Sequence, residues 1–509
     1  MSRYAAIDIG SNSIRLLAAE VHPPEPVRVL ASDRQVVRLG AGVFREGKMS
    51  QISMDLAFEV LKRMAGAYSG LDLMGVRAVG TAALRDASNQ KDFLGRAGEI
   101  LHTPVEVISG LEEARLVHLG VQSQWPHPKQ RLVLLDVGGG SAELILSDEG
   151  HFVQAFSKPL GAVRLTELFL KSDPPDAREL ARMEKYVQER VAGSAKKFAA
   201  KKVDRMIATS STAAATVCAI NGIKRSRRDE GDRASATASQ IRRLYKELSV
   251  QDLAGRNKVS GIGPRRAEII VAGTAVLSAV IEELGLARLY YSSAGVRDGI
   301  IADLAHRKVG MEQARMEDDQ RRVVLELAHK YDISTVHVRK VAELGNMLFD
   351  GLLNVHQLPL ACGRLLETAA HLYNIGHFVN EARHHRHSMY LVANSDLPGF
   401  SDRERLTIAT LCRYHRKSLP QPSHDAFQAL PEDDRHVVTM LAPLLRLAVA
   451  LDQSQEQKVQ RLETVVQEAG VELRLYSERD VDIEQWHAQK AGEAFREVYG
   501  KSLTVKAKR

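Results

Sequence analysis

Residues 8–13 read DIGSNS, and residues 136–141 read DVGGGS. Both stretches share the pattern D-x-G-x-x-S, and each is followed by an apolar run, at residues 14–21 and 143–146. Matched positions of the two stretches are separated by the same distance along the chain. A pattern that recurs in the same setting indicates an internal repeat. The sequence therefore predicts a duplicated domain.

Around the repeat, apolar runs of strand length alternate with segments of helical periodicity. This alternation is typical of an α/β architecture. The expected strands are residues 4–9, 14–21, 27–37, 76–79, 105–109, 143–146, 205–209 and 287–292. The expected helices are residues 50–67, a helix ending near residue 101, one beginning at residue 111, and residues 176–202 and 266–284.

The second half of the chain has a different pattern. From about residue 311 it consists of long amphipathic segments without strand alternation, and histidine becomes frequent. After Asp452, residues 465–476 predict a small hairpin and residues 483–498 a helix. The last four residues, 506–509, predict a frayed and solvated tail. These changes predict four domains, at residues 1–125, 126–310, 311–455 and 456–509.

The composition limits the classes of protein to consider. With 509 residues and 44% apolar content, the chain exceeds what one compact core usually holds. Its three cysteines lie far apart, so neither a disulfide framework nor a thiolate zinc site is expected. No apolar run reaches the roughly 18 residues that a membrane span requires. We therefore expect a cytoplasmic protein with no membrane partner.

The net charge of +7 favours a polyanionic partner. Nucleic acid is one candidate, but aromatic residues make up only 5% of the chain, and zinc-finger spacing and basic-region heptads are missing from the sequence. We therefore expect no binding of nucleic acid. The alternative is a basic soluble protein whose charge has no special partner.

Glycine-rich turns after strands can bind phosphate, because their backbone N–H groups are not shielded by side chains. In the first copy Ser11, Asn12 and Ser13 add side-chain donors, and in the second copy Gly138 and its two successors permit close approach of a ligand. A single turn of this kind is more often only a tight turn. Two at matched positions predict two lobes that grip one phosphate chain.

Two carboxylates accompany the second turn. Asp136 ends a strand, and the alternation of strand side chains puts Ser141 and Glu143 on one face of the next strand. Carboxylates beside a phosphate site favour Mg²⁺, which prefers oxygen ligands. The alternative is that Asp136 caps the turn and Glu143 is a solvated strand residue.

Two further motifs offer catalytic groups. Glu112 and Glu113 lie in the first turn of a helix, where either could align and deprotonate water, although the helix dipole favours acidic residues there in any case. Arg85 follows a strand and could hold a phosphate through two N–H groups, or could form a surface ion pair.

Taken together, these motifs carry a family resemblance over nearly the whole chain. The segments are residues 8–13, 80–85, 109–115, 136–143 and 295–299, followed by residues 384–400 and 413–417. The chain resembles the exopolyphosphatase and guanosine pentaphosphate phosphatase family. That resemblance implies duplicated actin-like (ribonuclease H-like) ATPase-superfold domains, then an all-α domain similar to HD-type phosphohydrolases and a small C-terminal α/β cap.

The resemblance also implies roles for individual residues. Glu113 becomes the catalytic base, and Asp136 and Glu143 become the ligands of Mg²⁺, directly or through water. The phosphate contacts become Asn12, Arg85, Gly138, Gly139, Ser141 and Arg266. One departure is the sequence Ser-Ser-Thr at residues 210–212, where the family has Ser-Gly-Thr. We expect Ser211 to make a left-handed backbone less comfortable there.

The helical domain departs from the HD-type pattern at its metal site. That site needs an adjacent His-Asp pair, and this chain has Tyr373-Asn374 in the corresponding place. Because tyrosine and a neutral amide cannot replace an imidazole and a carboxylate around a hydrolytic metal, we interpret the domain as non-catalytic. Its basic residues are expected to extend a track for a long anion, or to form a dimer contact.

The leading functional hypothesis is a magnesium-dependent exopolyphosphatase, acting as a homodimer. The nearest alternative is hydrolysis of guanosine pentaphosphate, which uses the same chemistry on a nucleotide. A sugar or acetate kinase on the same superfold would transfer phosphate to an acceptor other than water. A polyphosphate sensor without turnover is a third class of protein.

Overall fold

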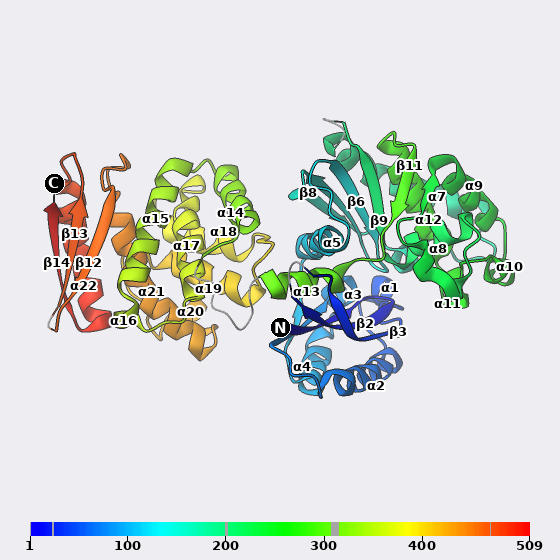
Figure 1. Ribbon diagram of the computed structural model, residues 1–509, viewed down its shortest axis with the longest axis horizontal. Helices are drawn as coiled ribbons and strands as arrows, with labels where there is room; N and C mark the ends of the chain where they lie inside the picture. The colour runs from blue at the N-terminus through cyan, green and yellow to red at the C-terminus, as the bar shows by residue number, and fades with distance from the viewer. Residues whose placement is uncertain (1, 23–24, 199–201, 307–314, 469, 509) are drawn as a thin grey trace. The chain divides into compact units, whose positions relative to one another are not determined.

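The computed structural model describes residues 2–22, 25–198, 202–306, 315–468 and 470–508 (Figure 1). The chain divides into two compact units, Met1–Gly310 and Met311–Arg509, and each is described by itself. Within the described ranges, no helix combines the length and the apolar character that crossing a membrane requires.

The first unit begins with a five-stranded sheet. Its strands are β1 (Ser2–Ile9), β2 (Ser13–Val21), β3 (Arg28–Val36), β4 (Gly75–Gly80) and β5 (Val105–Val107). They lie in the order β3-β2-β1-β4-β5. The first three pair antiparallel, whereas β4 pairs parallel with β1 and with β5. The tight turn at residues 10–12 joins β1 directly to β2.

A second sheet repeats this arrangement. Its strands are β6 (Arg131–Val137), β7 (Ala142–Asp148), β8 (His151–Lys158), β9 (Arg205–Thr209), β10 (Ser235–Thr237) and β11 (Arg288–Tyr291). The order is β10-β11-β9-β6-β7-β8, so β8, β7, β6, β9 and β11 correspond to the five strands of the first sheet and β10 is added at the edge. Two such sheets are the actin-like fold, and the predicted duplication and α/β class are confirmed.

Helices cover both sheets. They are α1 (Val43–Glu46), α2 (Gln51–Tyr68), α3 (Ala82–Asp86), α4 (Gln90–Leu101), α5 (Gly110–Gln124), α6 (Ala162–Phe169), α7 (Ala177–Phe198), α8 (Ser210–Ile220), α9 (Ala238–Ser249), α10 (Leu253–Lys258), α11 (Pro264–Ala267), α12 (Ile270–Glu283) and α13 (Val296–His306). The expected helix over residues 266–284 is interrupted, because Ile269 has non-helical backbone angles. Of the expected helix over residues 176–202, residues 199–201 lie outside the described residues.

Helices α5 and α13 lie between the two sheets (Figure 1). Alternation along β1 sends Ile7 and its neighbours of the same face toward α2 and α4, and sends Tyr4 and Ala6 toward α5 and α13. One buried cluster thus contains Ala6 from the first sheet and Leu134 from the second. The two halves of the unit therefore share a common apolar core.

Glycines let α5 and α13 come close together. A Cβ atom at Gly299 would lie 1.8 Å from the backbone oxygen of Leu116, and one at Gly120 would lie 2.3 Å from that of Gly295. Both approaches are impossible for any residue with a side chain. Close helix packing is therefore what requires glycine at Gly120 and Gly299, and Gly299 is the last residue of one of the motifs that carry the family resemblance.

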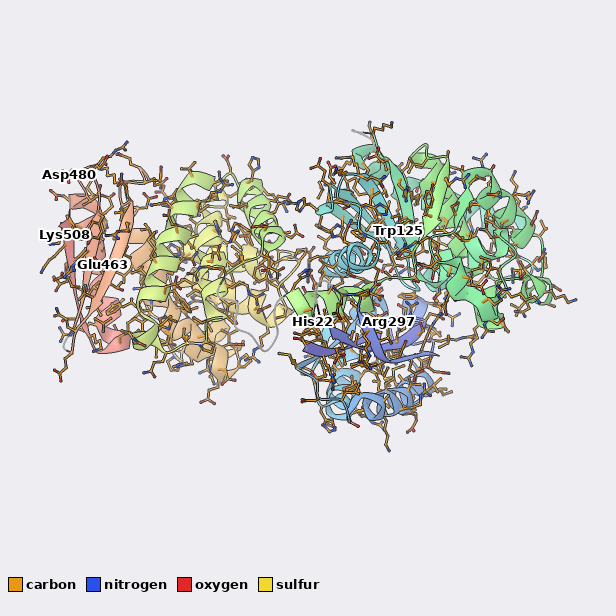
Figure 2. All side chains as sticks on the ribbon, in the orientation of Figure 1. His22, Trp125, Arg297, Glu463, Asp480 and Lys508 are labelled. Carbon is orange, nitrogen blue, oxygen red and sulfur yellow. The ribbon has the colours of Figure 1, made fainter. Side chains whose placement is uncertain are left out.

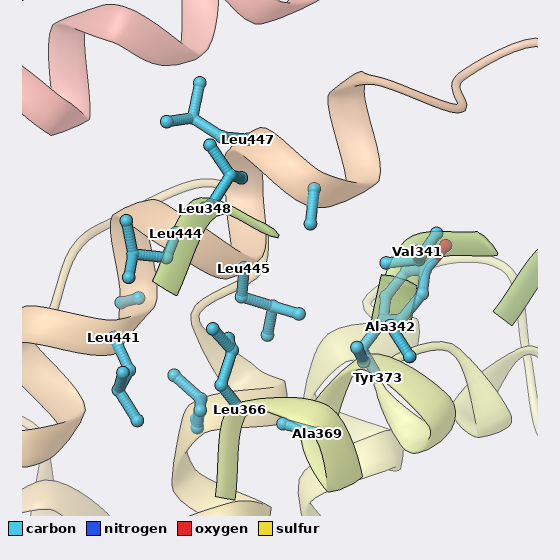
Figure 3. Packing of buried hydrophobic residues seen from close by; sticks show 14 of the residues in the cluster. Val341, Ala342, Leu348, Leu366, Ala369, Tyr373, Leu441, Leu444, Leu445 and Leu447 are labelled. Carbon is cyan, nitrogen blue, oxygen red and sulfur yellow. The ribbon is translucent and has the colours of Figure 1, made fainter. Parts of the chain in front are cut away.

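The second unit starts with helices α14 (Asp318–Lys330), α15 (Thr335–Gly351), α16 (Leu353–His356), α17 (Cys362–Leu372), α18 (His384–Ala393), α19 (Asp402–Arg413), α20 (Asp425–Gln428) and α21 (Glu432–Ala450). Leucine and other apolar side chains of α15, α17 and α21 form its core (Figure 3). This packing agrees with the all-α region expected from the sequence.

A small α/β part completes the second unit. It consists of β12 (Arg461–Val466), β13 (Gly470–Tyr476), α22 (Asp482–Tyr499) and β14 (Ser502–Lys508). The expected tail at residues 506–509 is wrong for residues 506–508, because β14 pairs in parallel with β13 as far as Lys508 (Figure 2). Leu503 and Val505 are buried on the inner face of β14, so apolar burial at alternate positions holds the strand in place.

Candidate active site

The two D-x-G-x-x-S turns have the same internal hydrogen bond. The N–H of Gly10 donates to the carbonyl oxygen of Ser13 at 3.1 Å, and the N–H of Gly138 donates to that of Ser141 at 3.0 Å. The turns also face each other, since a Cβ atom at Gly139 would lie 3.0 Å from the Cβ atom of Ser11. Glycine in the second turn therefore permits close approach of the two lobes.

A cavity of about 70 Å³ lies where the turns meet. The proposed phosphate contacts that line it are Ser11, Asn12, Ser13, Gly138, Gly139, Ser141 and Arg266. These residues come from both lobes, as the duplication predicts.

Four buried carboxylates surround this space. Asp8, Glu113 and Asp136 line the cavity, and Glu143 is fully buried beside them. Burial raises the pKa of all four, and the negative charges of Glu113 and Asp136 raise that of Glu143 further. Asp8 was not among the predicted site residues, although the repeat makes it the counterpart of Asp136.

Glu113 has the pKa of a general base. Burial raises the pKa of its carboxyl group to about 7, the cation of Arg85 opposes the rise, and the charges of Asp136 and Asp8 add to it. A base with a pKa near the working pH can both accept and release a proton efficiently.

Glu112 and Glu113 point in different directions from the first turn of α5. The side chain of Ser109 caps this helix by accepting from the N–H of Glu112 at 3.1 Å. Glu112 is turned away from the cavity, where it accepts from Arg115 Nε at 2.8 Å and from Arg77 Nη2 at 3.2 Å. Burial raises the pKa of Glu112, but the cations of Arg115 and Arg77 lower it by more, so the pKa lies below its usual value. Only Glu113 therefore faces the cavity.

Arg85 lies behind Glu113 and does not line the cavity. Its Nη1 atom donates to the carbonyl oxygen of Ile108 at 2.7 Å and to Glu113 Oε2 at 3.1 Å. In this arrangement Arg85 orients the carboxylate of Glu113, which is a different position from the phosphate contact expected.

The donor set near Asp136 and Glu143 fits a hard cation. Asp136 Oδ1 and Glu143 Oε2 are buried, and neither has a hydrogen-bond partner among the described residues. The other oxygen of Glu143 accepts from Ser157 Oγ at 2.8 Å. Among the described residues, there is no group of three or more His, Cys, Asp and Glu side chains that could bind one metal ion. Mg²⁺ needs only one or two carboxylates when waters and substrate oxygens complete its shell.

Several arginines gather beside the cavity. Arg15, Arg266 and Arg297 line it (Figure 2 labels Arg297). Arg34 and Arg228 lie close to them: burial and the positive charges of Arg15, Arg266, Arg228 and Arg297 lower the pKa of Arg34. Burial and the positive charges of Arg228 and Arg15 lower the pKa of Arg266 to about 9. Mutual repulsion of this kind favours an anionic ligand. Of these arginines, only Arg266 was predicted from the sequence, because the cluster assembles from distant segments.

The turn at residues 210–212 supports two of these arginines. Ser211 Oγ accepts from Arg15 Nη2 at 2.9 Å, and the carbonyl oxygen of Ser211 accepts from Arg228 Nη2 at 3.3 Å. The expected strain at Ser211 is misplaced, since the residue with a left-handed backbone is Ser210, at a φ of 72°. The hydroxyl group of Ser210 donates to the carbonyl oxygen of Val137 at 2.9 Å, which helps to hold this conformation.

In the second unit, Tyr373 belongs to a buried chain of hydrogen bonds. The hydroxyl group of Tyr373 donates to His337 Nε2 at 2.6 Å, and His337 Nδ1 donates to Asp452 Oδ2 at 2.7 Å. Both ring nitrogens of His337 are therefore used within the protein.

Comparisons with known proteins agree with this arrangement. Residues 18–308 match the model of the Ppx/GppA phosphatase family, and residues 320–488 match Ppx/GppA phosphatase domain III. The Aquifex aeolicus family member is 26% identical, covering 60% of this chain and 98% of its own, with a TM-score of 0.53. An exopolyphosphatase from Cytophaga hutchinsonii is 24% identical, covering 61% and 100%, with a TM-score of 0.56.

Proposed function

Because the chain belongs to the Ppx/GppA phosphatase family, we propose that it is an exopolyphosphatase, which releases terminal orthophosphate from inorganic polyphosphate. One observation carries this proposal: a buried carboxylate with a pKa of about 7, Glu113, faces two opposed phosphate-binding turns beside a cluster of arginines. The Cytophaga hutchinsonii structure that resembles this chain is named an exopolyphosphatase.

The chemistry follows from the positions of these groups. The terminal phosphate binds to the N–H groups of residues 11–13 and 139–141. Water attacks its phosphorus atom, Glu113 accepts the proton from that water, and the bond to the bridging oxygen breaks. The products are orthophosphate and a polyphosphate shorter by one unit. Arg85 keeps the carboxylate of Glu113 in position, because it donates to that group at 3.1 Å.

A bound Mg²⁺ would be held by Asp136 and Glu143, with water between if needed, and would supply neutralisation of the charge on the phosphate oxygens. The two orphaned oxygen atoms of these residues support this assignment.

The arginines beside the cavity favour a substrate with several phosphates. Arg15, Arg266 and Arg297 can each donate to oxygens beyond the terminal phosphate. Among the described residues that line the cavity, none is aromatic. A purine base usually stacks on an aromatic ring, so the lining favours polyphosphate over a nucleotide.

Hydrolysis of guanosine pentaphosphate is the second candidate, because it requires the same base, turns and cation. Purified protein with Mg²⁺ should be given long-chain polyphosphate, short-chain polyphosphate and guanosine pentaphosphate in parallel. We expect kcat/KM to be highest for polyphosphate. A higher value for guanosine pentaphosphate would reverse the assignment, and no release of phosphate without an added acceptor would favour a kinase or a sensor.

A further inference from the structure

The glycine-rich turn at residues 138–141 is bonded to the start of α6. The N–H of Ala162 donates to the carbonyl oxygen of Gly138 at 3.0 Å, and the N–H of Val163 donates to that of Gly139 at 2.9 Å. Both donors lie in the first turn of α6, where backbone N–H groups have no acceptor within the helix. The helix therefore fixes two peptide groups of the turn through its own backbone.

The third carbonyl oxygen of the turn, that of Gly140, is held by a side chain instead. Arg164 Nε donates to it at 2.6 Å, and Arg164 Nη2 donates to Asp86 Oδ2 at 2.6 Å. The guanidinium group also lies 4.0 Å from the centre of the Phe44 ring. With these three contacts and an exposed fraction of 15%, the side chain of Arg164 has a fixed position.

Holding the carbonyl oxygens decides where the N–H groups of the turn point. In a planar trans peptide group, the C=O of one residue and the N–H of the next point in opposite directions. Because the carbonyl oxygens of Gly138, Gly139 and Gly140 are all bonded to α6, the N–H groups of residues 139–141 point away from it. None of these three N–H groups donates to an acceptor among the described residues, and all three residues line the cavity.

Arg164 thus does for the last peptide group of the turn what backbone N–H groups do for the first two. We propose that Arg164 is a positioning residue of the phosphate site: by holding the carbonyl oxygen of Gly140, it directs the N–H of Ser141 toward the terminal phosphate. This role rests on the proposed function, in which the turn binds that phosphate. Arg164 is not among the residues that line the cavity, so it acts through the turn.

The other contact of Arg164 reaches the half of the unit that contains the first sheet. Asp86 is the last residue of α3 and follows Arg85, which donates to the carboxylate of Glu113. A role confined to holding the two halves together is therefore the alternative to test. The two roles use different nitrogen atoms of Arg164, so substitutions can separate them.

Three variants make this separation. Arg164→Lys puts a carbon atom in the place of Nε, so it loses the bond to Gly140 but keeps a positive charge that can reach Asp86. Asp86→Asn has the opposite effect, because it removes the ion pair and leaves the bond to Gly140. Glu268→Gln is the matched control, since Glu268 forms another ion pair between the same two halves, with Arg38 Nη2 at 2.7 Å, and does not line the cavity.

The test is a calorimetric titration of the full-length protein with orthophosphate in saturating Mg²⁺. We expect Arg164→Lys to weaken binding by about tenfold or more, the effect of losing a hydrogen bond to a charged group. Asp86→Asn and Glu268→Gln should stay within a few-fold of the wild type. With long-chain polyphosphate, kcat/KM of Arg164→Lys should fall by the same factor. Its pH midpoint, which depends on Glu113, should not move, whereas a displaced base would shift it.

The outcomes distinguish this role from the proposed function. Equal affinity for orthophosphate in Arg164→Lys and Glu268→Gln, or an equal loss in Arg164→Lys and Asp86→Asn, would overturn the role of Arg164 and leave the exopolyphosphatase assignment standing. Weakened binding in Arg164→Lys alone, with no release of phosphate from polyphosphate by the wild type, would support the role and contradict that assignment. A wild type that does not bind orthophosphate would overturn both.

Discussion

Arg85 Nη1 lies 3.1 Å from Oε2 of Glu113, and the same nitrogen donates to the carbonyl oxygen of Ile108 at 2.7 Å. The carboxylate that faces the cavity is therefore held by a cation that is itself fixed to the backbone. A base that must be aligned with water benefits from such a fixed partner. Arg85 lies in α3, just after β4, and its contact with Glu113 connects this part of the chain to the first turn of α5.

The first prediction separates the two neighbouring glutamates. Glu113→Gln should lower kcat by about 10²- to 10⁴-fold with little change in KM, because a base acts mainly in the transition state. Glu112→Gln should leave kcat within a few-fold and should lower the Tm instead, since Glu112 pairs with two buried arginines. Steady-state kinetics and thermal unfolding of both variants measure the difference. Near-normal kcat for Glu113→Gln would remove it from the role of base.

The second prediction concerns pH. The base is active as a carboxylate, so kcat/KM should rise with pH through about 7, the pKa of Glu113. Bound Mg²⁺ favours the carboxylate and should move the midpoint lower. Because the pKa in the folded protein is above that of the unfolded chain, Glu113 costs stability as pH rises from the unfolded value toward 7. Glu113→Gln should therefore be more stable than the wild type above pH 7, which a series of unfolding curves can measure.

The third prediction concerns the cation. Excess EDTA should abolish phosphate release, and Mg²⁺ should restore it. Asp136→Asn should raise the concentration of Mg²⁺ that gives half the maximal rate. Asp148→Asn is the control, because Asp148 lies at the other end of the β6–β7 pair and bonds to Arg131. Full activity in EDTA would contradict the assignment of Asp136 and Glu143.

The fourth prediction concerns the arginine cluster. Arg266→Ala should reduce kcat/KM by about ten- to a hundredfold, the effect of losing a charged hydrogen bond of ~1.5–3 kcal/mol. The loss should be larger at low salt than at high salt. Stability without substrate should not fall, because the change relieves repulsion from Arg228 and Arg15. Arg265→Ala provides the control, since Arg265 is exposed and does not line the cavity. Equal effects of the two substitutions would argue against a phosphate contact.

The fifth prediction concerns the buried ion pairs between α5, α13 and β4. Asp303 accepts from Arg77 Nη1 at 2.9 Å and from Arg115 Nη2 at 2.8 Å. Asp303→Ala leaves both cations without this partner and should cost about 3–5 kcal/mol of unfolding free energy. Glu106→Ala removes a more exposed partner of Arg77 and should cost about 1 kcal/mol or less. Urea unfolding of the first unit measures both, and equal losses would contradict the importance of burial.

The sequence alone was enough to establish the architecture of the first unit. Strand alternation and a repeated turn are local properties, and the duplicated D-x-G-x-x-S pattern predicted two similar sheets. The same repeat predicted that Asn12 and Gly139 bind one phosphate chain, and both residues line the same cavity. Burial at Leu503 and Val505 was also visible as alternation, yet the tail at residues 506–508 was misjudged, because a single short strand is stable only when β13 is beside it.

Only the tertiary structure decided which groups meet. Glu112 and Glu113 are equivalent by helix position, and their roles separate because Arg77 and Arg115 attract one and the cavity receives the other. The arginines beside the cavity come from β2, β3, α11, α13 and the segment after α8. Because these segments lie far apart in the sequence, no local pattern predicts that the arginines form a cluster.

The physical reason is the difference in range between the two kinds of information. Hydrogen bonding along the backbone and the alternation of apolar side chains act between near neighbours, so the sequence determined the elements and their repeat. The pKa of Glu113, the orphaned oxygens of Asp136 and Glu143 and the repulsion around Arg266 depend on charges and burial across distant segments. Those quantities exist only once the chain has folded, which is why the chemistry of the site came from the tertiary structure.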